Sequence, residues 1–209
     1  MGNERPTVVV IAGPNGAGKS TIAPALLRET LKIAEFVNAD DIARGLSAFA
    51  PDRVAIEAGR IMLNRLRVLA EARANFAFET TLASRSFAPR LAQLREKGYY
   101  FLLVYVWTNS PELSIARVAG RVIGGGHSVP EEVIRRRWKR NVDNFFTLYQ
   151  PLADYWSFHD NSDPVRLSKL AYGGAGRQTQ VIGNAIWGKL TLQRGSFKAR
   201  DDDAEREDP

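Results

Sequence analysis

Eight consecutive residues near the start of the chain have the types and spacing of a phosphate-binding loop. The pattern G-x-x-x-x-G-K-S is formed by Gly13, Pro14, Asn15, Gly16, Ala17, Gly18, Lys19 and Ser20. Glycines allow a tight turn in which successive backbone N–H groups point at one anion. In such a loop, Lys19 would reach the outer phosphates and the hydroxyl of Ser20 would ligate Mg²⁺. The segment from Gly13 to Thr21 is therefore predicted to bind ATP together with Mg²⁺.

The segments on either side of this loop provide the context that the motif requires. Thr7–Ala12 is short, apolar and rich in β-branched residues, which predicts a buried strand. After the loop, Ile22, Leu26 and Leu27 recur at helical spacing. A helix N-terminus at this point adds partial positive charge to the anion site. Strand, loop and helix together predict the binding of a nucleoside triphosphate.

Acidic side chains follow the next two predicted strands. Asp40 comes after a strand predicted near Ile33–Asn38, and Glu79 ends a strand predicted at Phe76–Glu79. Because the carboxyl ends of parallel strands open on one crevice, both carboxylates are expected to face it. Asp40 is predicted to accept or orient the proton of an acceptor hydroxyl, the alternative being a water-mediated Mg²⁺ contact or a loop cap. Glu79 is predicted to bind the acceptor hydroxyl or, as an equal alternative, to make a structural hydrogen bond.

Arginines gather on two later helices that are predicted to form a lid. Ser110 and Pro111 open the first helix, which presents Arg117 and Arg121 on one face. A capping box at Ser128–Glu131 is predicted to open the second helix, which carries Arg137 and ends near Tyr149. The three arginines could close on the γ-phosphate and spread its charge during transfer, the alternative being solvated helix faces.

The elements that would position these residues alternate between helix and strand. Ile42–Ala50 is expected to be a loop with a short helical turn, before helices at Pro51–Arg73 and Pro89–Lys97. Tyr99–Trp107 is continuously apolar and should be the central strand. Later strands are predicted at Tyr155–His159 and Val165–Tyr172, with a closing helix at Ile182–Leu192. The fold class is thus predicted as α/β: a three-layer sandwich whose mostly parallel sheet has helices on both faces.

The composition is that of a globular domain, and its positive charge would suit an anionic substrate or nucleic acid, although general solubility explains the charge equally well. The chain has 209 residues, no cysteine and a net charge of +6. Residues 196–209 hold three basic and six acidic residues, so the remaining 195 carry +9. We expect one kinase domain over 1–195, followed by an acidic, disordered tail over 196–209. No apolar run approaches the roughly 20 residues of a membrane span, and no signal peptide is seen, which favours a cytoplasmic location without membrane contact.

In their order along the chain, these motifs resemble those of the zeta toxin family of P-loop kinases, and the likeness runs from about Val8 to Leu192. It is closest to the small, single-domain branch of the family. It rests on five segments: Gly13–Ser20, Asn38–Asp40, Phe78–Thr81, Gly125–Pro130 and Asp160–Ser162. The resemblance implies the P-loop NTPase fold and a kinase that phosphorylates a hydroxyl of a UDP-amino sugar, UDP-N-acetylglucosamine. It also implies a toxin that a small helical antitoxin protein holds inactive.

The same resemblance implies roles for individual residues. Asp40 matches the catalytic aspartate of the family, and Lys19 and Ser20 match its ATP and Mg²⁺ residues. The substrate positions are matched by Glu79, Thr81 and, a few residues later than usual, Arg85. Arg117 or Arg121 matches one of two phosphate-clamping arginines. His127 stands near the position of the second, so that charge is expected from Arg137 or Arg140.

Other functions use the same parts and stay open at this stage. A kinase for another small molecule, such as an antibiotic or a nucleoside, would have the same motifs. A polynucleotide 5′-hydroxyl kinase would suit the positive charge, but no aromatic stacking platform interleaved with basic residues is seen. A non-kinase ATPase switch is a further alternative, although the chain has no Leu-Ser-Gly-Gly-Gln signature. A small hydroxylated acceptor is therefore preferred over nucleic acid as the partner.

Overall fold

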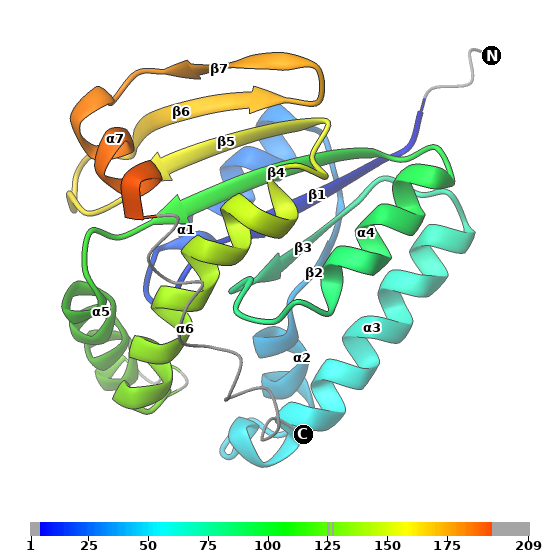
Figure 1. Cartoon of the computed structure of the whole chain (residues 1–209). Coiled ribbons are helices and arrows are strands. Elements are labelled where there is room, and N and C mark those ends of the chain that lie inside the picture. Colours follow the sequence, from blue (N-terminus) through cyan, green and yellow to red (C-terminus); the bar gives the residue numbers. More distant parts are fainter. Residues whose placement is uncertain (1–4, 125, 127, 194–209) are drawn as a thin grey trace, which may run out of the picture.

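The computed structural model describes residues 5–124, 126 and 128–193 (Figure 1). The predicted tail at 196–209 and the lid residue His127 lie outside these residues. All seven described strands form one sheet, in the order β2-β3-β1-β4-β5-β6-β7. The strands are β1 (Thr7–Ala12), β2 (Glu35–Val37), β3 (Phe76–Thr80), β4 (Tyr100–Trp107), β5 (Tyr155–Asp160), β6 (Ser168–Gly174) and β7 (Arg177–Val181).

The sheet is mostly parallel, as predicted. Strands β1 to β5 pair in parallel, and β4 is central as its continuous apolar sequence indicated. The last two strands run antiparallel and were not read correctly from the sequence. The strand predicted at Val165–Tyr172 begins only at Ser168, and β7 was missed. Because every residue of β7 is exposed and only Val181 is apolar, this edge strand has no hydrophobic pattern to find.

Helices connect the strands and cover both faces of the sheet. They are α1 (Lys19–Pro24) with its π-helical continuation η1 (Ala25–Thr30), α2 (Ala39–Leu46), the 3₁₀ turn η2 (Pro51–Val54), α3 (Ala55–Glu71), α4 (Phe87–Glu96), α5 (Pro111–Ile123), α6 (Glu131–Asn144) with its π-helical continuation η3 (Phe145–Tyr149), and α7 (Asn184–Gln193). The core on one face joins the strands to α3, α4, α6, η3 and α7, whereas α1 and η1 pack on the other. This is the three-layer α/β arrangement that the pattern predicted.

Two local predictions were wrong, both at helix starts. The segment Ile42–Ala50 was predicted as a loop with a short helical turn, but its first half belongs to the longer helix α2, which ends at Leu46. Asn38 caps this helix and accepts a 2.8 Å hydrogen bond from the Asp40 N–H, so the helix already begins at Ala39. The capping box at Ser128–Glu131 does not form. Pro130 itself is the N-cap of α6 and no side chain caps that end, so Ser128 stands two positions too early.

The apolar residues of β1 belong to the buried core beneath the candidate site. Val8 to Ala12 are fully buried, and an aromatic cluster fills the space between the sheet and η3. At the antiparallel end, the ring of Trp187 from α7 stacks on that of Trp156 at 5.7 Å.

Among the helices that the structure describes, none combines the length and the apolar character that crossing a bilayer requires.

Candidate active site

The loop between β1 and α1 has the backbone geometry of an anion cradle. Gly13 adopts φ +141° and lies so close to β4 that an added Cβ would fall 1.9 Å from the carbonyl oxygen of Val106. Gly18 adopts φ +89° directly before α1, where a Cβ would meet the amide nitrogen of Asn161 at 2.5 Å. Any side chain would therefore distort the loop at both positions. The glycines predicted to bind phosphate do have the conformations that only glycine adopts readily.

Lys19 lies in the interior of this loop. Its side chain is 6% exposed, its Nζ donates a 2.9 Å hydrogen bond to the Pro14 carbonyl oxygen, and it lies 3.6 Å from a carboxylate oxygen of Glu79. Burial lowers the pKa of Lys19, while the negative charges of Glu79 and Asp40 counteract part of that effect. The ammonium group is thus held where the outer phosphates of a nucleotide would bind.

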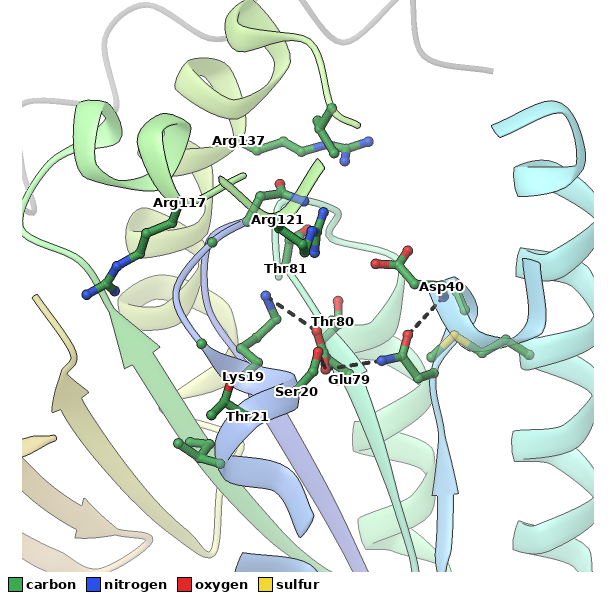
Figure 2. Close-up of a pocket in the computed structure, with 18 of the residues that line it drawn as sticks. Lys19, Ser20, Thr21, Asp40, Glu79, Thr80, Thr81, Arg117, Arg121 and Arg137 are labelled. Atoms are coloured by element: carbon green, nitrogen blue, oxygen red, sulfur yellow. Dashed lines mark hydrogen bonds and ion pairs between the residues drawn. The ribbon is translucent and has the colours of Figure 1, made fainter. Parts of the chain in front are cut away.

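Glu79, near the end of β3, is hydrogen-bonded to the start of α1 and to the residue that follows β2. The parallel register places it beside Ile11 of β1, at the carboxyl end of β3. Its Oε2 accepts hydrogen bonds from the Ser20 hydroxyl at 2.8 Å and from the side-chain amide of Asn38 at 3.2 Å (Figure 2). This carboxylate is therefore committed to the phosphate loop, which matches the structural alternative for Glu79 rather than a side chain directed only at an acceptor.

Asp40 projects into the same cleft from the first turn of α2. Its side chain is exposed, and Figure 2 shows its carboxylate directed across the cleft toward Arg121. Its charge acts on the buried Lys19. A carboxylate that faces the outer-phosphate position from the far side of the cleft is placed to receive the proton of an attacking hydroxyl.

Arg117 and Arg121 line the cleft together but point in different directions. The guanidinium of Arg117 donates to the carbonyl oxygens of Asn161 at 2.7 Å and Ser162 at 3.3 Å, and points away from Lys19 (Figure 2). The Asn161 amide in turn donates to the Ala17 carbonyl at 2.8 Å. The loop after β5 is thereby fastened both to the phosphate loop and to α5. Asn161 belongs to the segment Asp160–Ser162 of the family resemblance, and the signal for its role is a polar cluster that follows a parallel strand.

The lid is anchored at the end of β4. The hydroxyls of Thr108 and Ser114 lie 2.8 Å apart, and the indole N–H of Trp138 on α6 donates to Thr108 at 3.2 Å. Helices α5 and α6 share a small core of their own, formed by Val118, Val129 and Ile134. These contacts fix the base of the helix pair that carries the lid arginines.

The cleft has a volume of about 790 Å³ and brings together most of the predicted site. The predicted residues that line it are Asn15, Gly16, Gly18, Lys19, Ser20, Thr21, Asp40, Glu79, Thr81, Arg117, Arg121 and Arg137. Gly13, Pro14 and Ala17 are buried in the loop behind it. Arg85 is exposed and does not line this cleft, although the next residue, Ser86, does.

The oxygen atoms beside Lys19 suit a hard divalent cation. The Ser20 hydroxyl and the Glu79 carboxylate are the ligand types that Mg²⁺ prefers, directly or through water. In the described part of the chain, no three His, Cys, Asp or Glu side chains are grouped as a metal cage. A site with one hydroxyl, one carboxylate and substrate phosphates is how Mg²⁺ is commonly held, so these residues fit it.

Comparison with known proteins gives matches over most of the chain. The model of the Zeta toxin family matches residues 1–153. An uncharacterized protein of Haemophilus influenzae is 29% identical over 130 residues, which are 62% of this chain and 91% of that protein. Among solved structures, the AvrRxo1-ORF1:-ORF2 complex with ATP has a TM-score of 0.73 at 17% identity. The match covers 90% of this chain but only 64% of the other. The PezAT chromosomal toxin-antitoxin system of Streptococcus pneumoniae has a TM-score of 0.59 at 20% identity, covering 77% and 69% of the two chains.

Proposed function

This chain belongs to the zeta toxin family of kinases, and from that premise we propose that it transfers the γ-phosphate of ATP to a hydroxyl of a small acceptor, with Mg²⁺. The observation that carries the proposal is the shared cleft. The phosphate loop with Lys19 opens into the same space as Asp40 on one side and the lid arginines on the other. Phosphoryl transfer needs these three groups and little more from the protein.

The residues divide the reaction between them. Backbone N–H groups of the loop and the Lys19 ammonium hold the phosphates, and Ser20 with Glu79 would hold Mg²⁺, which supplies charge neutralisation between the outer phosphates. Asp40 orients the acceptor hydroxyl and takes its proton as the oxygen attacks the γ-phosphorus. Arg121 and Arg137 stabilise the charge on the transferring group.

Arg117 has a different part in this proposal. Its guanidinium is bound to the loop after β5, so it secures the nucleotide end of the cleft rather than the phosphorus. Asn161 supports the same end through its bond to the phosphate loop.

Two further proposals concern the identity of the acceptor and a protein partner. Family membership makes UDP-N-acetylglucosamine the first acceptor to test, and Thr81, which lines the cleft, could contact an acceptor there. PezAT is a toxin-antitoxin system, and AvrRxo1-ORF1 was solved with ORF2. We therefore propose a small protein partner that inhibits this chain.

A label-transfer assay tests the function. The purified protein is incubated with Mg²⁺ and [γ-³²P]ATP against UDP-N-acetylglucosamine, nucleosides, aminoglycosides and 5′-hydroxyl oligonucleotides. Label in one small-molecule class, absent with Lys19→Ala, is expected. Release of inorganic phosphate without transfer across the panel would contradict the kinase proposal and favour a switch ATPase, and label only in the oligonucleotide would contradict a small acceptor.

A further inference from the structure

The loop between β3 and α4, which spans residues 81–86, forms part of the cleft wall. Thr81 at its start and Ser86 at its end both line the cleft, whereas Leu82 is fully buried. Leu82 has φ +55°, a left-handed conformation that is uncommon for residues other than glycine. Such a conformation persists where the surrounding structure holds it in place. The contacts of this loop therefore determine how Thr81 and Ser86 are presented to a ligand.

Two buried side chains, one at the end of α6 and one in η3, hold this loop. The side-chain amide of Asn144 donates to the carbonyl oxygens of Leu82 at 2.8 Å and Ala83 at 3.3 Å. The hydroxyl of Tyr149 donates to the carbonyl oxygen of Ser84 at 2.7 Å. Three consecutive carbonyl groups of the loop are thereby bound by side chains that are only 9% and 0% exposed.

The hydroxyl of Tyr149 also lies at the start of α4. The N-cap residue of that helix, Ser86, makes no side-chain capping hydrogen bond. Burial raises the pKa of Tyr149 to about 12, and hydrogen bonding to the backbone N–H groups of Phe87 and Ala88 opposes part of that rise. The oxygen of Tyr149 thus faces N–H groups that a capping side chain would otherwise satisfy.

The helix that carries these two side chains also carries an arginine of the lid. Asn144 follows Arg137 by seven residues, or about two helical turns, so both lie on one face of α6. The next segment, Phe145–Tyr149, is π-helical. Because π-helical bonds join residues five apart, this segment turns Tyr149 to the side of Asn144, five positions earlier. In Figure 1, α6 runs from the lid beside α5 across the face of the sheet. One helix therefore connects Arg137 with the loop after β3.

We infer, on the basis of the proposed function, that Asn144 and Tyr149 are positioning residues for the acceptor. They hold the loop after β3 in a fixed place relative to Arg137, so that an acceptor bound against Thr81 presents its hydroxyl beside Asp40. Neither Asn144 nor Tyr149 lines the cleft, so both act through the loop and not on the ligand.

A calorimetric titration tests this role without catalysis. Protein loaded with Mg²⁺ and the ATP analogue AMP-PNP is titrated with UDP-N-acetylglucosamine as the acceptor probe. Tyr149→Phe removes one hydroxyl and should raise the Kd of the probe about threefold to tenfold, the usual effect of one lost hydrogen bond. Asn144→Ala removes both bonds of the amide and should raise that Kd by about tenfold or more. The Kd of AMP-PNP, measured separately, should stay unchanged in both variants.

Tyr105→Phe is the matched control. Tyr105 is as fully buried as Tyr149, and its hydroxyl donates to Asn141 of the same helix, α6, and not to the loop. The control should lower the denaturant midpoint of unfolding about as much as Tyr149→Phe does. It should nevertheless leave the Kd of both ligands unchanged. A purely structural role for Tyr149 would make the two variants alike in every measurement.

Four results would overturn the inference. They are an unchanged Kd of the probe in Tyr149→Phe, an equal change in Tyr105→Phe, a Kd of AMP-PNP that rises as much as that of the probe, and no binding of the UDP-sugar by the native chain. If Asn144→Ala does not fold, Tyr149→Phe decides, because it deletes a single oxygen atom. A failure of the proposed function is separate: it would appear as UDP-sugar binding that depends on Tyr149 while no acceptor takes label from ATP.

Discussion

The hydroxyl of Ser20 donates a 2.8 Å hydrogen bond to Glu79, and this contact ties the phosphate loop to the end of β3. The same oxygen of Glu79 accepts from Asn38 at the end of β2. One carboxylate therefore joins the end of β3 to the start of α1 and to the residue that follows β2, directly beside the Lys19 ammonium. In the proposed mechanism, loss of the Glu79 carboxylate would disturb Mg²⁺ binding more than acceptor binding.

Glu79→Gln should reduce kcat about 10- to 100-fold, the usual effect of removing a residue that orients a metal ligand. The concentration of Mg²⁺ that gives half-maximal rate should rise, because the amide offers Ser20 and the metal a weaker acceptor. Steady-state rates at several Mg²⁺ concentrations measure both effects. Glu57→Gln, on the exposed first turn of α3, is the control. An unchanged Mg²⁺ dependence in Glu79→Gln would contradict the assignment.

Asp40→Asn should lower the rate of phosphate transfer by about 10²- to 10⁴-fold, the range for a positioned general base. ATP affinity should stay within about threefold, because Asp40 stands across the cleft from the loop. The adjacent Asp41 is a matched control: it is equally exposed but pairs with Arg44 on the outside of α2. If Asp41→Asn lost as much activity as Asp40→Asn, the loss would come from the helix and not from a base.

Short-range patterns predicted several structural features around the cleft. The phosphate loop, the central position of β4 and the Ser110 cap of α5, which accepts from the Leu113 N–H at 3.2 Å, all depend on residues close in sequence. Contacts between distant residues could not be read in the same way. The hydrogen bond between Ser20 and Glu79 joins residues that are 59 positions apart in the sequence, and the bond from Arg117 to Asn161 joins residues 44 positions apart. Nothing in the local pattern of an arginine on a helix shows which way its guanidinium turns.

Arg117→Ala should raise the KM for ATP about tenfold, because two hydrogen bonds from a charged group to the loop after β5 are lost. The effect on kcat should be much smaller, since the guanidinium points away from Lys19. Asn161→Ala should act in the same direction by releasing Ala17. Arg177→Ala on the exposed edge strand β7 is the control. A large fall in kcat with an unchanged KM would instead place Arg117 at the transferred phosphate.

Asp154→Ala should destabilise the fold by about 2–4 kcal/mol, because it leaves partly buried donors without their acceptor. The Asp154 carboxylate is 11% exposed and accepts from Arg95 at 3.0 Å and from the Phe101 N–H at 2.8 Å. Denaturant unfolding measures the loss. The exposed pair of Arg67 and Glu71 provides the contrast, since Glu71→Ala should cost less than about 0.5 kcal/mol. Equal losses in the two variants would contradict this ranking.

His159 should make the fold less stable in mild acid. Burial, together with the nearby charge of Lys169, lowers the pKa of His159 to about 4, and its Nε2 lies 3.0 Å from the Ser157 hydroxyl. In the unfolded chain the pKa is close to 6.5, so between about pH 6.5 and 4 the unfolded state binds a proton that the folded state does not. This contribution to stability is therefore complete above pH 6.5, falls as the pH is lowered, and changes no further below 4.

His159→Gln removes the side chain that binds this proton, so the stability of the variant should depend less on pH. Between pH 7 and pH 4, the free energy of unfolding of the variant should fall by on the order of 2–3 kcal/mol less than that of the native chain. Denaturant unfolding of both proteins at half-unit pH intervals measures the difference, in which acid effects common to both cancel. Because the amide of glutamine can still bond to Ser157, stability at pH 7 should change little. Parallel curves for the two proteins from pH 7 to 4 would show that His159 titrates normally in the folded state.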